Sequence, residues 1–67
     1  MSRYTIDIGE KFDGLLTNLA KEKETTKSEI IRRAVASYAF LNEEIEKGKK
    51  VSITDKQDHV LKEVVLP

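Results

Sequence analysis

The segment Thr26-Lys27-Ser28-Glu29 places two hydroxyls, an ammonium and a carboxylate on four successive residues. Thr26 followed three residues later by Glu29 fits a capping box, in which the hydroxyl accepts a hydrogen bond from the third backbone N–H of a helix. The first N–H groups of a helix lack internal partners and carry partial positive charge, so they suit a phosphate oxygen. Lys27 adds a cation and Ser28 a hydroxyl donor. The segment therefore predicts a helix start at which simple capping and anion binding are both open, since a capped end can leave N–H groups free.

Chemistry that would indicate an enzyme is scarce in the sequence. No nucleophile is paired with a base, and the Thr-Thr-Lys-Ser run lacks the glycines of a P-loop. His59 is the single histidine and there is no cysteine, so disulfides and thiolate metal sites are excluded. We therefore expect no enzymatic activity and no metal or other cofactor.

The chain is short and its charges balance. A domain of 67 residues is marginally stable alone, and without cysteines a partner chain is the usual remedy. Lys and Arg equal Asp and Glu at 12 each, which argues against strong nonspecific attraction to nucleic acid but allows a few well-placed cations. No apolar run approaches the roughly 20 residues of a membrane span, and a signal peptide is not expected. We expect a cytoplasmic protein without a membrane partner.

The segment 3–8 alternates between polar and apolar side chains. One face would hold Tyr4, Ile6 and Ile8, and the other Arg3, Thr5 and Asp7. Aromatic and β-branched residues at a period of two predict a strand with one buried face. No adjacent segment can pair with it in a tight hairpin, and an unpaired strand is a liability. The simplest partner is the same strand of a second copy of the chain.

Two helices are expected after Gly9. The apolar face of the first consists of Phe12, Leu15, Leu16, Leu19 and Ala20, and it should end near Lys23 or Glu24. The apolar stripe of the second consists of Ile30, Ile31, Ala34, Val35, Tyr38, Leu41 and Ile45. A stripe this wide needs more than one partner helix, which again favours a dimer. Gly48 should stop this helix. Arg32 and Arg33 are expected to be solvated or to pair with acids such as Glu29, and are not assigned to DNA.

The tail has a different composition. Val51–Thr54 reads as a strand, Asp55–Asp58 has turn composition, and Val60–Leu66 is rich in β-branched residues. We predict a small hairpin here. The domain boundary is accordingly expected at residue 48, between a domain of residues 1–48 and an extension of residues 49–67.

The order of strand, helix, Thr-Thr-Lys-Ser turn and longer helix resembles the ribbon-helix-helix (Arc/MetJ/CopG-like) family of prokaryotic, plasmid and viral repressors and antitoxins. The resemblance runs from Arg3 to about Tyr38. Arg3–Ile8 matches the ribbon, Thr26–Ile31 the start of the second helix, and Ala34–Tyr38 its apolar part, while the first helix matches at Phe12, Leu16, Leu19 and Ala20.

The resemblance implies a mostly α fold with an N-terminal β-ribbon, in which two chains form an intertwined homodimer and pair their ribbons antiparallel. The dimer core would consist of Tyr4, Ile6, Ile8, Phe12, Leu16, Leu19, Ile30, Ile31, Ala34, Val35 and Tyr38. The C-terminal hairpin would be an addition to this fold.

By the same resemblance, the polar face of the ribbon enters the major groove of double-stranded DNA. Arg3, Thr5 and Asp7 would contact bases, with Arg3 suited to guanine O6 and N7. Asp7 departs from what a groove favours: its carboxylate could accept from a cytosine amino group, pair with Arg3 of the partner subunit, or simply be solvated. Thr26, Lys27 and Ser28 would contact phosphates, with Lys23 as a further candidate.

Three functions follow from this resemblance and remain open. The first is a sequence-specific repressor that binds DNA as a dimer or a higher-order assembly. The second is an antitoxin that binds its own promoter and holds a toxin protein through the tail. The third is a dimerisation module without a DNA role. The apolar tail favours the repressor over the antitoxin, since antitoxin tails are commonly disordered alone.

Overall fold

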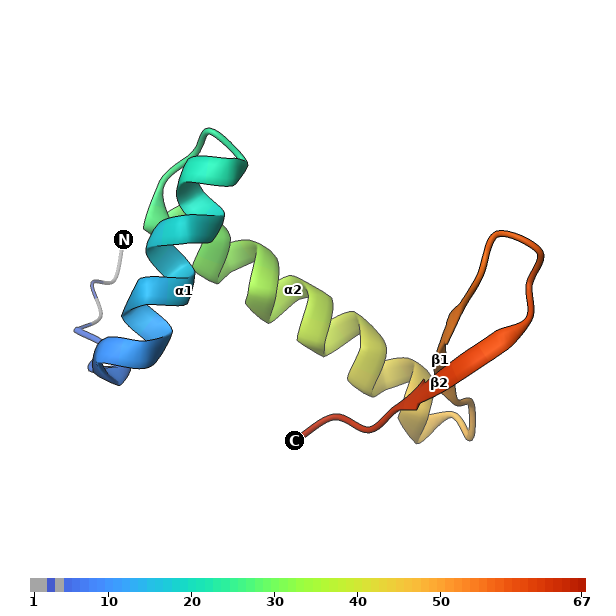
Figure 1. Cartoon of the computed structure of the whole chain (residues 1–67). Helices are drawn as coiled ribbons and strands as arrows, with labels where there is room; N and C mark the ends of the chain where they lie inside the picture. The colour runs from blue at the N-terminus through green and yellow to red at the C-terminus, as the bar shows by residue number, and fades with distance from the viewer. Residues whose placement is uncertain (1–2, 4) are drawn as a thin grey trace. The chain divides into compact units, whose positions relative to one another are not determined.

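The computed structural model describes residues 3 and 5–67 and consists of two helices followed by a two-stranded antiparallel sheet (Figure 1). The elements are α1 (Gly9–Glu22), α2 (Lys27–Glu46), β1 (Val51–Thr54) and β2 (Val60–Val64). The chain divides into two compact units, Met1–Ala34 and Val35–Pro67. No helix in the described part of the chain is long and apolar enough to cross a membrane.

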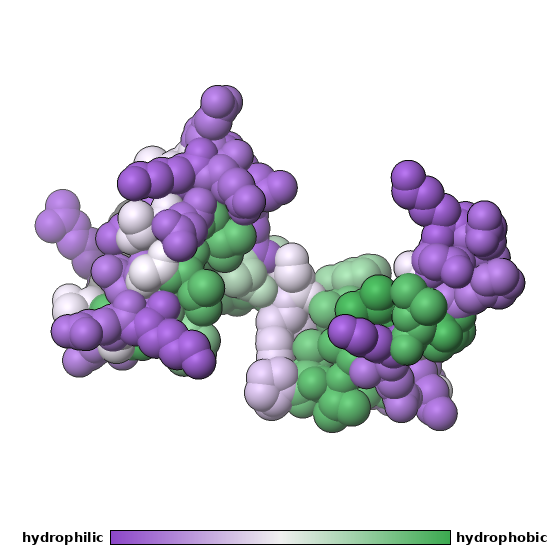
Figure 2. Space-filling model, in the orientation of Figure 1, coloured by the Kyte–Doolittle hydropathy of each residue, from purple (hydrophilic) through white to green (hydrophobic). Residues whose placement is uncertain are grey.

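The first unit buries little of its apolar surface. Among the described residues of the whole chain only Ala20 and Ile30 are buried, and both belong to this unit. Apolar side chains of α1 and of the start of α2, together with Ile8 before α1, border an open groove. Its lining consists of Ile8, Phe12, Leu15, Leu16, Leu19, Ile30, Ile31 and Ala34. Figure 2 shows apolar surface exposed on both units. A lone chain thus leaves the predicted core largely in contact with water.

Both helices end in the same hydrogen-bonded motif but with different residues. At the end of α1 the N–H of Glu24 donates to the carbonyl of Lys21 and that of Thr25 to Ala20, and Glu24 has a φ of 52°. At the end of α2 Gly48 has the corresponding position, with a φ of 89°. These are Schellman motifs, which require a left-handed residue. The helix stop predicted at Gly48 is confirmed, whereas α1 achieves the same stop with a glutamate, in a conformation that is strained for a side chain with a Cβ.

Glu24→Gly should therefore stabilise the protein by about 0.5–1 kcal/mol, because glycine adopts the left-handed conformation without a Cβ clash. Gly48→Ala is the matched reverse substitution, and it should destabilise by a similar amount. Urea unfolding at a fixed protein concentration measures both. A Glu24→Gly variant no more stable than the parent would show that the turn carries no such strain.

The second unit contains the predicted C-terminal hairpin. Its register pairs Val51 with Val64, Ser52 with Glu63, Ile53 with Lys62 and Thr54 with Val60. The shift between the last two pairs is a β-bulge. β2 ends at Val64, two residues earlier than the expected strand Val60–Leu66, so Val65 and Leu66 lie outside it. The hairpin prediction is confirmed by this ladder between β1 and β2.

Asp55 organises the turn of this hairpin. Its Oδ1 accepts hydrogen bonds from the backbone N–H of Gln57 at 2.9 Å and of His59 at 3.0 Å, and its Oδ2 lies 3.2 Å from Nδ1 of His59. The backbone N–H of His59 is the main reason why the pKa of Asp55 lies below its ordinary value of 3.8, against an opposing effect of burial. Asp58 completes the turn in the left-handed region, with a φ of 66°.

The hairpin should accordingly lose stability in acid. A carboxyl with a lowered folded-state pKa stabilises the structure above its ordinary value of 3.8, and this contribution disappears as the pH falls through the lowered pKa. Hydrogen exchange of the amides of Gln57 and His59, followed below pH 5, measures the loss. Asp55→Ala should abolish the pH dependence and Asp58→Asn should retain it. Equal acid sensitivity in Asp55→Ala and the parent would contradict this role.

Residues 3 and 5–8 contain no strand or helix in this single chain. The predicted ribbon requires a strand from a second copy of the chain, which a single chain does not contain. The ribbon and the dimer therefore stay predictions. Tyr4, expected on its apolar face, lies outside the described residues. The predicted domain boundary at residue 48 also stays a prediction, because the two compact units describe contacts within one chain only.

Candidate nucleic-acid interface

The N-terminus of α2 is capped and still has free donors. The hydroxyl Oγ1 of Thr26 accepts the N–H of Glu29 at 3.1 Å, and the carbonyl of Thr26 accepts the N–H of Ile30, also at 3.1 Å. The capping hydrogen bond predicted for Thr26 is confirmed. The N–H groups of Lys27 and Ser28 have no acceptor among the residues that the structure describes. Both side chains are exposed, so this helix end presents two donors and a partial positive charge to the surroundings.

The carboxylate of Glu29 does not complete the capping box by turning back to Thr26. It lies instead against two arginines, with Oε1 3.4 Å from Nε of Arg33 and Oε2 3.6 Å from Nε of Arg32. Of the two alternatives open for these arginines, solvation alone or a pair with Glu29, the structure shows the pair. One carboxylate thus holds two guanidinium groups on the first turns of α2. Because both arginines already have a carboxylate partner, they are less suited to bind an external anion than a cation without such a partner would be.

Lys27 has a partner that the sequence did not reveal. Its Nζ lies 3.2 Å from Oδ1 of Asp13, in a contact that is both a hydrogen bond and an ion pair. Asp13 belongs to α1, so the pair joins the two helices of the first unit. The side chains of Lys27 and Asp13 are 50% and 57% exposed. The ammonium thus remains accessible, but it carries a neutralising carboxylate.

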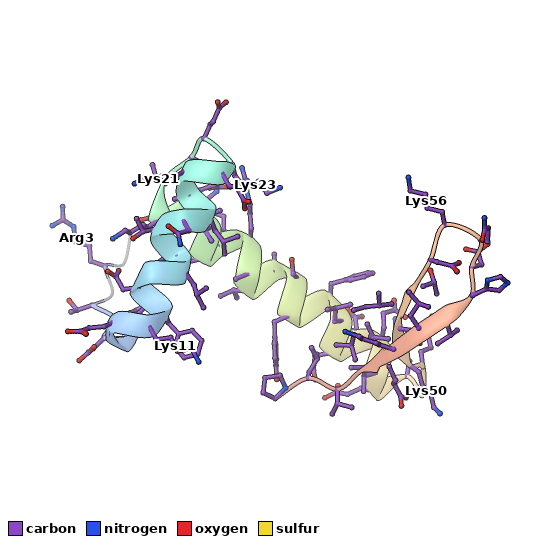
Figure 3. The ribbon with its side chains drawn as sticks, in the orientation of Figure 1. Arg3, Lys11, Lys21, Lys23, Lys50 and Lys56 are labelled. Atoms are coloured by element: carbon purple, nitrogen blue, oxygen red, sulfur yellow. The ribbon has the colours of Figure 1, made fainter. Side chains whose placement is uncertain are left out.

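The predicted base-contacting residues lie on the segment before α1. Arg3, Thr5 and Asp7 are all exposed. Arg3 has no ion pair within residues 3 and 5–67, and its guanidinium extends away from the chain (Figure 3). Asp7 has a local partner, because its Oδ1 accepts the N–H of Gly9 at 3.2 Å. No hydrogen bond or ion pair in the described part of the chain joins these three residues to Thr26, Lys27 or Ser28.

Two further lysines precede the turn between α1 and α2. Lys21 and Lys23 lie at the C-terminal end of α1, near the turn that leads into α2 (Figure 3). Neither has an ion pair with another described residue. Lys23 is the further phosphate candidate anticipated from the sequence, whereas the sequence did not single out Lys21. Basic residues are common in the last turn of a helix because they complement its dipole, so its sequence position alone gave no functional signal.

Most of the predicted dimer core is exposed in the single chain. Ile30 is buried and Leu16, Ile31 and Ile8 are half-buried, whereas Phe12 is 60% exposed. The other predicted core residues with described positions are also exposed: Ile6, Leu19, Ala34, Val35 and Tyr38. The residues that line the groove of the first unit form a contiguous apolar surface, which on a small protein is typical of an interaction site.

Tyr38 has an additional contact within its own chain. Its hydroxyl donates a hydrogen bond of 2.7 Å to the backbone oxygen of Pro67. The phenol thus joins α2 to the segment that follows β2, within the second unit. The contact uses the polar tip of the side chain and leaves much of the ring exposed, so it does not conflict with a place in an apolar interface.

Comparison with known proteins identifies the family of the chain. The family model of "Ribbon-helix-helix protein, copG family" matches residues 3–39, more than half of the chain. A search of curated proteins and a search of solved structures gave no match. The matched residues include the segment before α1, all of α1, the capped turn and most of α2. Proteins of this family are DNA-binding transcription regulators that act as dimers. The chain belongs to the copG family of ribbon-helix-helix proteins.

Proposed function

We propose that this protein is a sequence-specific transcriptional repressor that binds double-stranded DNA as a homodimer. Residues 3–8 of the two subunits pair into a ribbon that enters the major groove, and the N-termini of both α2 helices clamp phosphates beside it. The observation that carries the proposal is the N-terminus of α2, where two unpaired backbone N–H groups adjoin an ammonium and a hydroxyl.

The clamp is suited to one phosphate on each side of the groove. The Thr26 hydroxyl fixes the first turn of α2 by accepting the backbone N–H of Glu29. The N–H groups of Lys27 and Ser28 are therefore held in place before DNA binds. Donors that are already oriented lose little conformational freedom on binding. The partial charge of the helix end favours a phosphate oxygen. The clamp fixes the position of the protein on the duplex without reading its sequence.

The ribbon supplies the sequence dependence. Arg3 is exposed and has five N–H donors, which match O6 and N7 of guanine. Thr5 can donate or accept, and its methyl group suits a thymine methyl. Asp7 is the weakest candidate, because its carboxylate accepts the N–H of Gly9 and thereby supports the start of α1. We therefore assign base readout mainly to Arg3 and Thr5 and a mainly structural role to Asp7.

The extension formed by residues 49–67 supports the repressor over the antitoxin alternative. Antitoxin tails commonly fold only on their toxin. Here β1 and β2 form a hydrogen-bonded ladder closed by the Asp55 turn within a single chain. A toxin partner consequently has no support from this segment. We assign residues 1–48 to DNA binding and dimerisation, and residues 49–67 to a separate hairpin extension.

Selection of bound duplexes from a random DNA pool tests this function. The proposal predicts enrichment of one sequence with two related half-sites, because two identical subunits contact the DNA about a two-fold axis. Recovery of duplexes without any shared sequence would reject a sequence-specific repressor. Recovery of no duplex at all would reject a DNA-binding role.

Lys27→Ala should weaken binding to all DNA sequences alike. The lysine contacts phosphate, so its loss should reduce the slope of log affinity against log salt by about 0.9 for each of the two contacts of a dimer. Lys56→Ala is the matched control, since it removes the same charge from the turn of the hairpin (Figure 3). Fluorescence anisotropy in a salt series measures both variants. A loss confined to the selected sequence would contradict a phosphate contact.

A further inference from the structure

The strongest unassigned feature near the proposed interface is the ion pair between Asp13 and Lys27. Its Nζ–Oδ1 distance is 3.2 Å. Within the described part of the chain it is the one ion pair that joins α1 to α2. The other ion pairs between α2 and described residues connect positions at most five apart in sequence. The family match and the clamp explain Lys27 but give no reason for a carboxylate beside it.

The pair is too exposed to contribute much to stability. Both side chains are about half exposed, and ion pairs in such positions stabilise folded proteins little or not at all. A carboxylate at this place has a larger effect on an incoming anion. A phosphate oxygen that contacts Nζ of Lys27 at hydrogen-bond distance comes within roughly 6 Å of the Asp13 carboxylate, which is inside the Debye length at physiological salt.

We propose that Asp13 is a charge that competes with DNA phosphate for Lys27 and so keeps the clamp weak. Phosphate binding must separate the ammonium from its carboxylate or bring two negative charges close together. Either way the clamp contributes less to binding than a free lysine would, for every DNA sequence alike. The inference rests on the proposed function, since it assigns a regulatory residue to the same phosphate contact.

A weak clamp is consistent with the charge of the whole chain. The formal net charge is zero, so nonspecific attraction to DNA is small from the outset. Asp13 reduces it further at the contact that is independent of sequence. The protein then depends on the base contacts of the ribbon for stable binding, which favours release from unrelated DNA.

A role of Asp13 in positioning Lys27 would have the opposite effect on DNA affinity. If Asp13 merely held Lys27 in the correct position, its removal would lower DNA affinity. Competition predicts that Asp13→Asn raises affinity, because the amide keeps the shape of the side chain and loses the charge. We expect about a threefold increase for each subunit, or about tenfold for a dimer, as for the loss of a weak exposed ion pair. The salt slope should become steeper.

Fluorescence anisotropy with the duplex recovered from the random pool and with an unrelated duplex tests the proposal. Asp13→Asn should tighten binding to both duplexes by the same factor. Glu10→Gln is the matched control, because it removes a negative charge one helical turn away on α1 without an ion pair among the described residues. It should change affinity much less. In a Lys27→Ala background the effect of Asp13→Asn should fall to that of the control.

Several outcomes would overturn the inference without affecting the proposed function. They are weaker binding by Asp13→Asn, an increase no larger than that of Glu10→Gln, and an undiminished increase in the absence of Lys27. If the unmodified protein binds neither duplex, the proposed function itself fails. Circular dichroism and thermal unfolding of each variant verify that the compared proteins are equally folded.

Discussion

Phe12→Ala should turn a cooperatively folded dimer into a largely unfolded chain at micromolar concentration. In the single chain Phe12 is 60% exposed at the apolar groove of the first unit, so truncation would cost little there. In the predicted dimer the same ring is buried against the partner. Removing a buried phenylalanine costs about 3–5 kcal/mol, and a dimer contains two of them. That loss is comparable to the whole stability of a small domain.

Phe40→Ala provides a matched control for this effect. Phe40 is 62% exposed in the single chain, almost the same as Phe12, but it lies outside the predicted dimer core. Urea unfolding and sedimentation equilibrium at several protein concentrations measure stability and association together. The dimer predicts a large loss for Phe12→Ala and a small one for Phe40→Ala. Equal effects would show that the groove on the first unit is not the subunit interface.

Arg3→Ala should lower affinity for the selected site by about 1–3 kcal/mol for each contact and relax the base preference at one position of each half-site. The reason is that a bidentate guanidinium satisfies both O6 and N7 of one guanine. Binding to unrelated DNA should change much less. Competition binding against duplexes with single base changes measures the two effects separately.

Arg3→Lys separates charge from geometry at the same position. Lysine retains the positive charge but presents a point charge on a flexible stem instead of a planar fork. It should restore part of the affinity and little of the base preference. If Arg3→Lys behaved like the parent on every duplex, the contribution of Arg3 would be electrostatic, and base readout would have to be assigned elsewhere on the ribbon.

Local features of the fold could be predicted from the sequence. The cap at Thr26, the stop at Gly48 and the hairpin of residues 51–64 each depend on residues within a few positions of one another. For such features side-chain type and spacing largely decide the hydrogen bonds. The pair between Glu29 and Arg33 belongs to the same group, since four residues separate neighbours on one helix face.

Contacts between elements could not be predicted in the same way. Asp13 and Lys27 are fourteen residues apart, and Tyr38 and Pro67 twenty-nine, so their meeting depends on how the chain turns between them. The left-handed conformation of Glu24 also went unforeseen, because glutamate gives no signal for it. The consequence for the site is substantial: the lysine of the clamp is already paired, and Asp7 is engaged at the start of α1.

The ribbon and the dimer depend on a second chain, which explains why they are predictions of the sequence and the family rather than features of the single chain. A strand needs a partner for its hydrogen bonds, and the apolar residues around Phe12 need a partner surface. The predicted association of two copies would meet both requirements at once. The stability of the protein and its DNA-binding surface should therefore appear together as its concentration rises.

In the proposed complex the ribbon binds DNA in the major groove through Arg3. Methylation interference on the selected duplex tests it most directly, because dimethyl sulfate marks guanine N7 in the major groove and adenine N3 in the minor groove. We predict that methylation of one guanine in each half-site abolishes binding of the parent protein, and that Arg3→Ala loses sensitivity at those guanines. Interference confined to adenine N3 would contradict major-groove recognition by the ribbon.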